Sequence, residues 1–299
     1  MLKMILAILC ILTLTLNASQ EKLESLGVRF QNQTVIFDEK WKGNSEDLKL
    51  LEDLNTMKDL CFSGAKIRDE DVLNLESISW IETLVLRKLT ISDLALSNIP
   101  SMKKLKQLSI ASCTQIQGLG IVELAKSNTI TQLHLPHMHL DDKDVAPLEK
   151  MTQLEYLSLH SNDITTASIQ YLRTLKKLKW LYLKGVKIAP EDCQYIAGLS
   201  SLKELSLTFT RLDERHLNIL SVLPDLKSLR IRNSNITDKD LYPIANFKAL
   251  RYLQLRGKGQ KYTVTETGLS WLAQNCPHIE FFEKDTSDPE LSSPLKKIK

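Results

Sequence analysis

The sequence is poor in the residues that mark several common classes of protein. Its 299 residues include only 10 glycines, 9 prolines and 5 cysteines, and aromatic residues make up 6%. So little glycine and proline excludes a fibrous or linker protein, and five cysteines are too few for a disulfide scaffold. With 43% hydrophobic residues, the chain is too apolar to be disordered. Neither sign of charge dominates, because 39 Lys and Arg face 36 Asp and Glu, so the total indicates no class of partner.

One short apolar segment lies at the N-terminus. Lys3 precedes the uncharged run of residues 4–16, and residues 17–19 (Asn-Ala-Ser) offer small side chains for cleavage. The run is shorter than the ~20 residues needed to cross a bilayer, so the pattern predicts a secretory signal peptide over residues 1–19. No second apolar stretch of that length follows. We therefore expect a mature chain without a membrane span, secreted or periplasmic.

Leucine is abundant, and the leucines are periodic. The hexapeptides LKQLSI, LEYLSL, LKWLYL and LKSLRI share the pattern L-x-x-L-x-L, whose central leucine recurs every 24 residues with a single step of 25. These central leucines are Leu60, Leu84, Leu108, Leu133, Leu157, Leu181, Leu205, Leu229 and Leu253. We expect Ile36 to hold the same place one period upstream. A period of this length indicates a solenoid of short stacked units.

Each unit continues in the same way after its hexapeptide. An Ile or Leu is followed by a Ser, Thr or Asp, then by an acidic residue and apolar residues at helical spacing. The Ser, Thr or Asp can cap a helix, and the acidic residue suits the positive end of that helix. The expected caps are Ser92, Asp141, Thr165, Asp213 and Thr237, and the expected first-turn acids are Asp69, Asp93, Asp142 and Asp238. Each unit therefore predicts a strand, a turn, a short helix and a return.

This unit resembles the leucine-rich repeat, in particular the exported bacterial subtype LxxLxLxxxxITDxxLxxLxxL, of which RIRNSNITDKDLYPIANF is the clearest copy. The resemblance implies an α/β fold, a horseshoe solenoid with a parallel concave sheet and short convex helices. We expect an N-terminal cap and partial first repeat over residues 20–50. The solenoid is then expected over 51–283 and a flexible tail over 284–299.

The repeat also separates the cysteines of the mature chain. Cys113 and Cys193 fall three units apart, and neighbouring strands lie about 4.8 Å apart, which places this pair beyond the reach of a disulfide. Cys61 and Cys276 lie near opposite ends of the array. The sequence therefore predicts four free thiols.

Alternate strand residues in such a sheet point out to the concave side. In the C-terminal half these residues and their neighbours include many aromatic and basic side chains, while Glu155 and Glu204 are the only acids. Because aromatic residues and arginine are enriched at binding hot spots, we expect a basic, aromatic binding face. The predicted ligand-binding residues are Tyr156, Trp180, Tyr182, Lys184, Phe209, Arg230, Arg232, Tyr252 and Arg256, with Lys179 and Arg251 beside them.

A protein is the partner that this pattern favours, and an acidic glycan is the alternative. Nucleic acid is disfavoured because no nucleic-acid-binding motif is present and the chain carries an export signal. His134, His137 and His160 lie on adjacent units, but no carboxylate or thiol completes a metal set, so no metal site is predicted and metal binding there stays open. The motifs G-x-S-x-G and H-E-x-x-H and a phosphate-binding glycine loop are absent. The sequence therefore indicates a non-enzymatic binding module without a cofactor.

Overall fold

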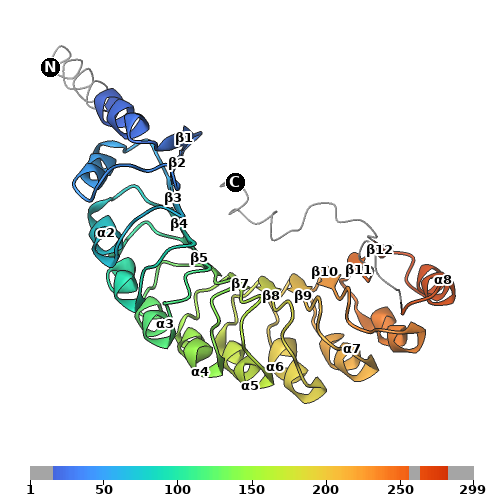
Figure 1. The fold of residues 1–299 in the computed structure, drawn as a ribbon. Coiled ribbons are helices and arrows are strands. Elements are labelled where there is room, and N and C mark those ends of the chain that lie inside the picture. Colours follow the sequence, from blue (N-terminus) through green and yellow to red (C-terminus); the bar gives the residue numbers. More distant parts are fainter. Residues whose placement is uncertain (1–15, 256–262, 282–299) are drawn as a thin grey trace, which may run out of the picture.

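The computed structural model describes residues 16–255 and 263–281, and the chain follows a curved path with strands on the inner side and helices on the outer side (Figure 1). The strands are β1 (Arg29–Gln31), β2 (Thr34–Phe37), β3 (Asp59–Ser63), β4 (Thr83–Arg87), β5 (Gln107–Ala111), β6 (Gln132–His134), β7 (Tyr156–Ser158), β8 (Trp180–Tyr182), β9 (Glu204–Ser206), β10 (Ser228–Arg230), β11 (Tyr252–Gln254) and β12 (Glu280–Phe281). They form one sheet in sequence order. β1 and β2 are antiparallel, and every later neighbouring pair is parallel, as the repeat predicts.

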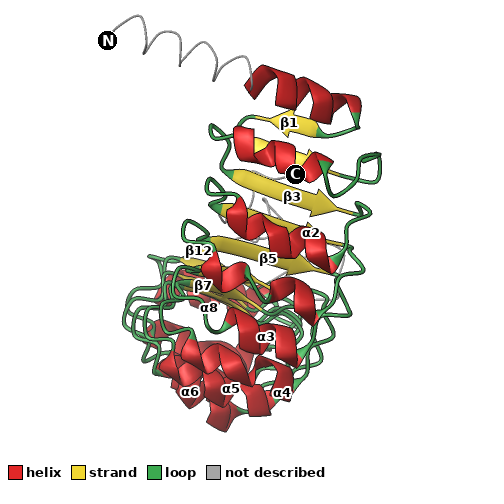
Figure 2. Ribbon diagram, turned by 90° about the vertical axis from the view of Figure 1, so that its left-hand side faces the viewer, coloured by secondary structure: helices red, strands yellow, loops and turns green. Residues whose placement is uncertain are grey.

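Short helices line the convex side, stacked one above another (Figure 2). The α-helices are α2 (Asp69–Leu73), α3 (Gly118–Leu124), α4 (Asp142–Val145), α5 (Thr166–Ile169), α6 (Cys193–Ala197), α7 (Glu214–Leu220) and α8 (Glu266–Asn275). The 3₁₀ helices are η1 (Asp47–Asp53), η2 (Asn74–Ser77), η3 (Asp93–Leu96), η4 (Ile99–Ser101), η5 (Ala146–Lys150), η6 (Gln170–Thr174), η7 (Pro190–Asp192) and η8 (Asp238–Asn246). Residues 16–25 are also helical. Among the described residues no helix is long and apolar enough to cross a membrane.

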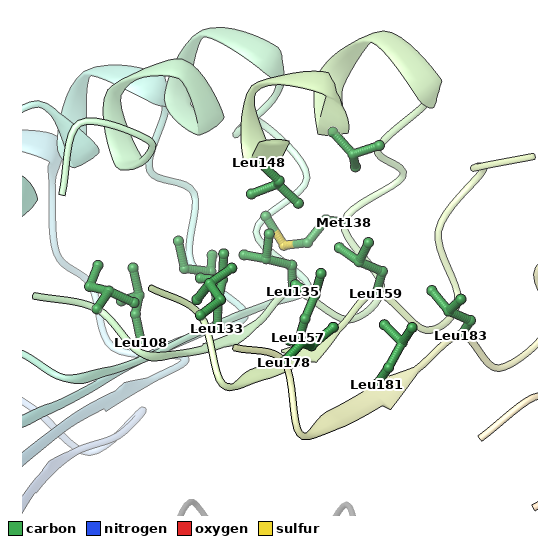
Figure 3. Packing of buried hydrophobic residues seen from close by; sticks show 14 of the residues in the cluster. Leu108, Leu133, Leu135, Met138, Leu148, Leu157, Leu159, Leu178, Leu181 and Leu183 are labelled. Carbon is green, nitrogen blue, oxygen red and sulfur yellow. The ribbon is translucent and has the colours of Figure 1, made fainter. Parts of the chain in front are cut away.

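The core is a continuous stack of the repeated leucines. All nine central leucines, from Leu60 to Leu253, are fully buried, and the strand register pairs each with the next. Figure 3 shows how Leu133, Leu157 and Leu181 lie side by side beneath Leu148 and Met138. Full burial of one leucine stabilises the fold by about 1.5–3 kcal/mol, so each coil depends on its neighbours for most of its stability.

The predicted placement of Ile36 is wrong by one residue. Val35 pairs with Leu60 and points into the core, whereas Ile36 pairs with Cys61 on the opposite face. Because successive strand residues alternate between faces, a shift of one residue moves a side chain through the sheet. β2 enters the sheet through an antiparallel hairpin with β1 rather than from a preceding coil, so the 24-residue spacing does not hold there.

The predicted helix caps lie where the repeat places them. Side chains of Ser92, Asp141, Thr165 and Asp213 each accept a hydrogen bond from a first-turn amide. Thr237 differs, because its amide and hydroxyl both donate to Asp240, three residues later in the chain.

The first-turn acids join neighbouring coils, a role that dipole reasoning alone does not predict. Asp69 accepts hydrogen bonds from the amide of Ser92 at 2.7 Å and from its hydroxyl at 2.5 Å. Asp142 accepts the same pair from Thr165 at 2.8 and 2.6 Å, and the hydroxyl of Ser168 as well. Asp238 accepts the pair from Thr265 at 2.7 and 2.5 Å. Each carboxylate therefore ties the cap of the next coil to its own helix.

Two helix glycines leave space for first-turn carboxylates of the preceding coil, Asp93 and Asp238. A Cβ at Gly120 would lie 2.6 Å from Asp93 Oδ1, and a Cβ at Gly268 would lie 2.3 Å from Asp238 Oδ1. Both distances are shorter than van der Waals contact, so a larger residue would displace the carboxylate. Glycine at these two positions preserves the contact between coils.

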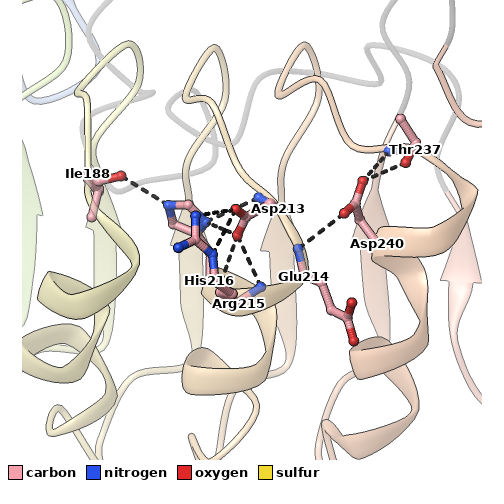
Figure 4. A network of polar contacts seen from close by, with 7 residues as sticks. All are labelled: Ile188, Asp213, Glu214, Arg215, His216, Thr237 and Asp240. Carbon is pink, nitrogen blue, oxygen red and sulfur yellow. Dashed lines mark hydrogen bonds and ion pairs between the residues drawn. The ribbon is translucent and has the colours of Figure 1, made fainter.

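A related network joins α7 to its neighbours (Figure 4). The His216 ring contacts Asp213 Oδ1 through Nδ1 at 2.7 Å and the Ile188 carbonyl of the preceding coil through Nε2 at 3.0 Å. Arg215 also donates to Asp213. Although burial raises the pKa of Asp213, hydrogen bonds from Arg215 and His216 lower it well below the ordinary aspartate value. These contacts therefore keep the Asp213 carboxylate ionised and hydrogen-bonded.

The turn after each strand from β3 to β10 contains a residue with a left-handed backbone. These residues are Gly64 (φ 71°), Lys88 (51°), Ser112 (54°), His137 (55°), Ser161 (56°), Gly185 (81°), Phe209 (61°) and Asn233 (59°). Glycine and asparagine adopt this conformation readily, whereas a bulky side chain does so at a cost. Phe209 is therefore the least expected occupant of the position.

Cys61, Cys113, Cys193 and Cys276 are all free and buried, which confirms the predicted thiols. The helical residues 16–25 run across the predicted cleavage point after Ser19, and Leu23 is fully buried. The signal peptide stays a prediction. The predicted tail over 284–299 lies outside the described residues.

Candidate functional site

The concave face has the rows that the repeat predicts. Strand register aligns Tyr156, Trp180 and Glu204 across β7, β8 and β9. The next outward row aligns Ser158, Tyr182 and Ser206 across the same strands, and Arg230 continues it on β10. Arg256 lies outside the described residues. The other eight predicted binding residues therefore come from five neighbouring coils.

Tyr156 and Tyr182 were expected to be exposed, and this expectation is wrong. Each is only 2% exposed, and their ring centroids lie 5.3 Å apart at 39°. Strands about 4.8 Å apart on the inner side of a curve crowd large side chains together, so the two rings cover one another. Burial and the nearby Glu204 carboxylate raise the pKa of the Tyr182 hydroxyl far above its usual value. The tyrosines form the floor of the face.

The two acids of this face are already paired. Arg230 Nε lies 3.0 Å from Glu204 Oε1, and their side chains are 22% and 15% exposed. Lys179 Nζ lies 2.8 Å from Glu155 Oε2, with both side chains about a third exposed. Arg230, which the sequence places among the ligand contacts, therefore holds β10 to β9. Within the described residues, neither acid is left to neutralise Lys184.

Phe209 is the most exposed of the predicted aromatic residues. Its side chain is 48% exposed, and Lys184 Nζ lies 5.6 Å from the ring centroid, within the range of a cation–π contact. Tyr252 is 42% exposed, and Trp180 is half-buried. Arg232 is also half-buried, on the coil after Phe209. The structure thus leaves an apolar ring and a cation together at the surface where the strands end.

The histidine cluster lies in the middle of the concave face. The rings of His134 and His160 have centroids 5.2 Å apart, and those of His137 and His160 are 5.3 Å apart. Burial lowers the pKa of His134 to about 3, assisted by the charges of His160, Arg87 and His137. Burial likewise lowers the pKa of His160 to about 4, with His137 and Lys184 contributing. In the part of the chain that the structure describes, no three His, Cys, Asp or Glu side chains are arranged to hold a metal ion.

The N-terminal part of the concave face is apolar instead. Ile36, Cys61 and Val85 form a small cluster across β2, β3 and β4, each at most 5% exposed. Burial raises the pKa of the Cys61 thiol to about 11. Since the thiolate is the nucleophile, this shift keeps Cys61 in its less nucleophilic thiol form at neutral pH.

Comparison with known proteins supports the fold. No model of a known protein family and no curated protein match the sequence. An internalin from Listeria monocytogenes is similar in structure, with a TM-score of 0.55 and 20% identity over 81% of this chain and 71% of that one. A leucine-rich repeat protein from Leptospira interrogans is also similar in structure, with a TM-score of 0.53 and 22% identity. The alignment covers 78% of this chain and 62% of the Leptospira chain, so this chain matches less than two thirds of that protein. At such identities the likeness establishes the fold alone, and this chain has the leucine-rich repeat solenoid fold that its sequence predicts.

Proposed function

We propose that the protein is a non-enzymatic module, secreted or periplasmic, that binds another protein through the C-terminal half of its concave face. The binding surface consists of Phe209 and Lys184 where the strands end, flanked by Trp180, Arg232 and Tyr252. Tyr156, Tyr182 and the Arg230–Glu204 pair form the floor that holds these side chains in place. Exposed aromatic residues beside cations are the side chains that contribute most to protein interfaces.

The conformation and exposure of Phe209 are the main support for this proposal. A bulky residue in the left-handed region costs about 1–2 kcal/mol, and the next coil has Asn233 at the same position. The side chain gains little burial in return, because it is 48% exposed. An exposed aromatic ring held in a backbone conformation that disfavours bulky residues supports a partner that covers it.

The absence of catalysis is part of the proposal. The buried Cys61 thiol has a pKa of about 11, and the pKa values of the half-buried His134 and the buried His160 are lowered to about 3 and about 4. Neither is suited to attack a substrate or to exchange protons near neutral pH.

Affinity capture tests the proposed surface. The immobilised chain is exposed to the extract and culture fluid of its source, in parallel with the variant Lys184→Glu/Phe209→Asn. A matched control, Lys239→Glu/Tyr242→Asn, makes the same chemical changes on the convex element η8, where Lys239 is exposed and Tyr242 is 54% exposed. We expect a protein captured by the unaltered chain and the control but lost with the concave variant. Equal capture by all three chains contradicts the assignment.

A further inference from the structure

A second charged surface runs along the edge where the strands begin. The residue immediately before each strand from β3 to β11 is, in order, Lys58, Glu82, Lys106, Thr131, Glu155, Lys179, Lys203, Lys227 and Arg251. The backbone joins these residues directly. The amide of Lys203 donates to the Lys179 carbonyl at 2.9 Å, Lys227 donates to Lys203 at 2.8 Å, and Arg251 donates to Lys227 at 2.9 Å. Successive members therefore lie one strand spacing apart, about 4.8 Å.

The two halves of this row differ in charge. In the first half the cations Lys58 and Lys106 are separated by Glu82 and followed by the neutral Thr131. The last four members, Lys179, Lys203, Lys227 and Arg251, are all cations, and we call them the basic edge. Like charges this close repel one another.

Little on the protein offsets that repulsion. Lys179 is paired with Glu155, but Lys203, Lys227 and Arg251 are exposed, and none of the three is paired with a carboxylate within the described residues. The four turns that lead into β8 to β11, residues 175–179, 199–203, 223–227 and 247–251, hold seven basic residues and one acid, Asp225. A row of unneutralised cations complements a ligand with a row of anions.

The spacing and the neighbouring side chains favour a polysaccharide. Side chains on one face of an extended peptide repeat every second residue, about 6.6 Å, which is longer than the step of the basic edge. One sugar of a 1,4-linked chain advances by a distance close to one strand spacing. Each end of the edge also has an aromatic ring on its concave side, Trp180 beside Lys179 and the 42% exposed Tyr252 beside Arg251. Such rings can stack on the apolar face of a pyranose.

We propose that the basic edge binds a linear anionic polysaccharide, with one acidic sugar facing each coil. The edge lies at the start of the strands, whereas Phe209 and Lys184 lie beyond their ends. The two surfaces share Trp180 and Tyr252, but the variants that test one surface leave the substituted residues of the other unchanged. This inference therefore does not rest on the proposed protein partner, and one surface can fail its test while the other passes.

Binding of the full chain to immobilised polygalacturonate and heparin tests the inference. We expect binding to both that weakens as salt rises, and none to neutral dextran. The variant Lys203→Glu/Lys227→Glu/Arg251→Glu should bind at least about tenfold more weakly. The matched variant Lys58→Glu/Lys104→Glu/Lys106→Glu changes two members of the first half of the row and the adjacent exposed Lys104. It alters the net charge equally and should retain most of the affinity. A thermal melt confirms that both variants are folded.

Three outcomes would overturn the proposal. The unaltered chain could fail to bind either polyanion, or the two triple variants could lose affinity equally, which would indicate a response to net charge alone. Polyglutamate could also bind as tightly as polygalacturonate under the same conditions, which would assign the edge to an acidic protein segment instead.

Discussion

Charged side chains that precede the strands differ in their contacts from those at the helix starts that follow the strands. At the starts of the helices that follow the strands, Asp69, Asp142 and Asp238 each accept hydrogen bonds from the next coil, so their charge stabilises the stack. In the turns before the strands, Lys203 and Lys227 are exposed and have no carboxylate partner within the described residues. The same repeat therefore has one edge whose carboxylates stabilise the fold through hydrogen bonds. On the other edge, where the strands begin, the charges of Lys203 and Lys227 do not stabilise the fold. Within the described residues, charged side chains that no carboxylate engages, such as those of this second edge, are candidates for binding.

Acid should produce the largest effect on the stacked core. His134 and His160 have pKa values lowered from 6.5 to about 3 and about 4, so the folded chain excludes protons that the unfolded chain binds. Their stabilising contribution is present above pH 6.5 and is lost as the pH falls toward 4, by about 2–3 kcal/mol for His160 alone at pH 4.5. Urea unfolding at pH 7 and pH 4.5 measures this loss.

Two substitutions locate the source of the acid effect. His160→Gln should reduce the difference in unfolding free energy between the two pH values. His139→Gln should not, since the side chain of His139 is 71% exposed and its Nδ1 lies 3.2 Å from the exposed Asp163 carboxylate. An equal response of both variants would show that the buried histidines do not govern acid stability.

Loss of one carboxylate between coils should have the next largest effect. Asp142→Ala removes the acceptor for the Thr165 amide, the Thr165 hydroxyl and the Ser168 hydroxyl, and we expect it to lower the free energy of unfolding by about 2 kcal/mol. Although burial raises the pKa of Asp142, these bonds outweigh it and lower the pKa, so this contribution is also lost at low pH. Asp163→Ala, which removes an exposed acid, is the control and should cost less than about 0.5 kcal/mol. Similar losses from the two variants would remove the distinction between engaged and exposed acids.

Replacing the exposed ring should stabilise the protein slightly. Phe209→Asn relieves the left-handed strain and should raise the free energy of unfolding by about 0.5 kcal/mol. The reciprocal change Asn233→Phe, at the same position of the next coil, should lower it. Thermal melts of both variants check the pair, and destabilisation by Phe209→Asn would mean that the ring serves the fold.

The smallest change is expected at the basic edge. Lys227→Ala removes an exposed cation that has no carboxylate partner among the described residues, and it should shift the free energy of unfolding by less than about 0.5 kcal/mol. A loss as large as that for Asp142→Ala would show that both edges serve the fold.

Much of the fold could be predicted because one repeat encodes it many times. The leucine period predicts the repeated strands, and the resemblance to the leucine-rich repeat implies that they form a parallel sheet. The Ser, Thr and Asp residues after the strands predict the helix starts. The Ile36 error arose where the period ends, at the hairpin before β2.

The site was less predictable, because it depends on contacts between coils. Which outward side chains are buried follows from curvature, so the burial of Tyr156 and Tyr182 could not be read from their alternation. The pairing of Arg230 with Glu204, 26 residues away, likewise appears only when β9 and β10 are side by side. One signal for Phe209 was present in the sequence. Gly64 and Gly185 occupy the equivalent turn position in other coils, which indicates a left-handed backbone that a phenylalanine adopts only at a cost.

Site-specific photo-cross-linking tests the binding account most directly. A photoreactive residue is placed at Phe209, on the concave side, or at Asn218, which is exposed on α7 of the same coil, and each chain is irradiated with the extract and culture fluid of its source. The account predicts a discrete protein adduct from position 209 that position 218 does not give. Adducts from position 218 alone, or the same adducts from both positions, would contradict binding through the concave face.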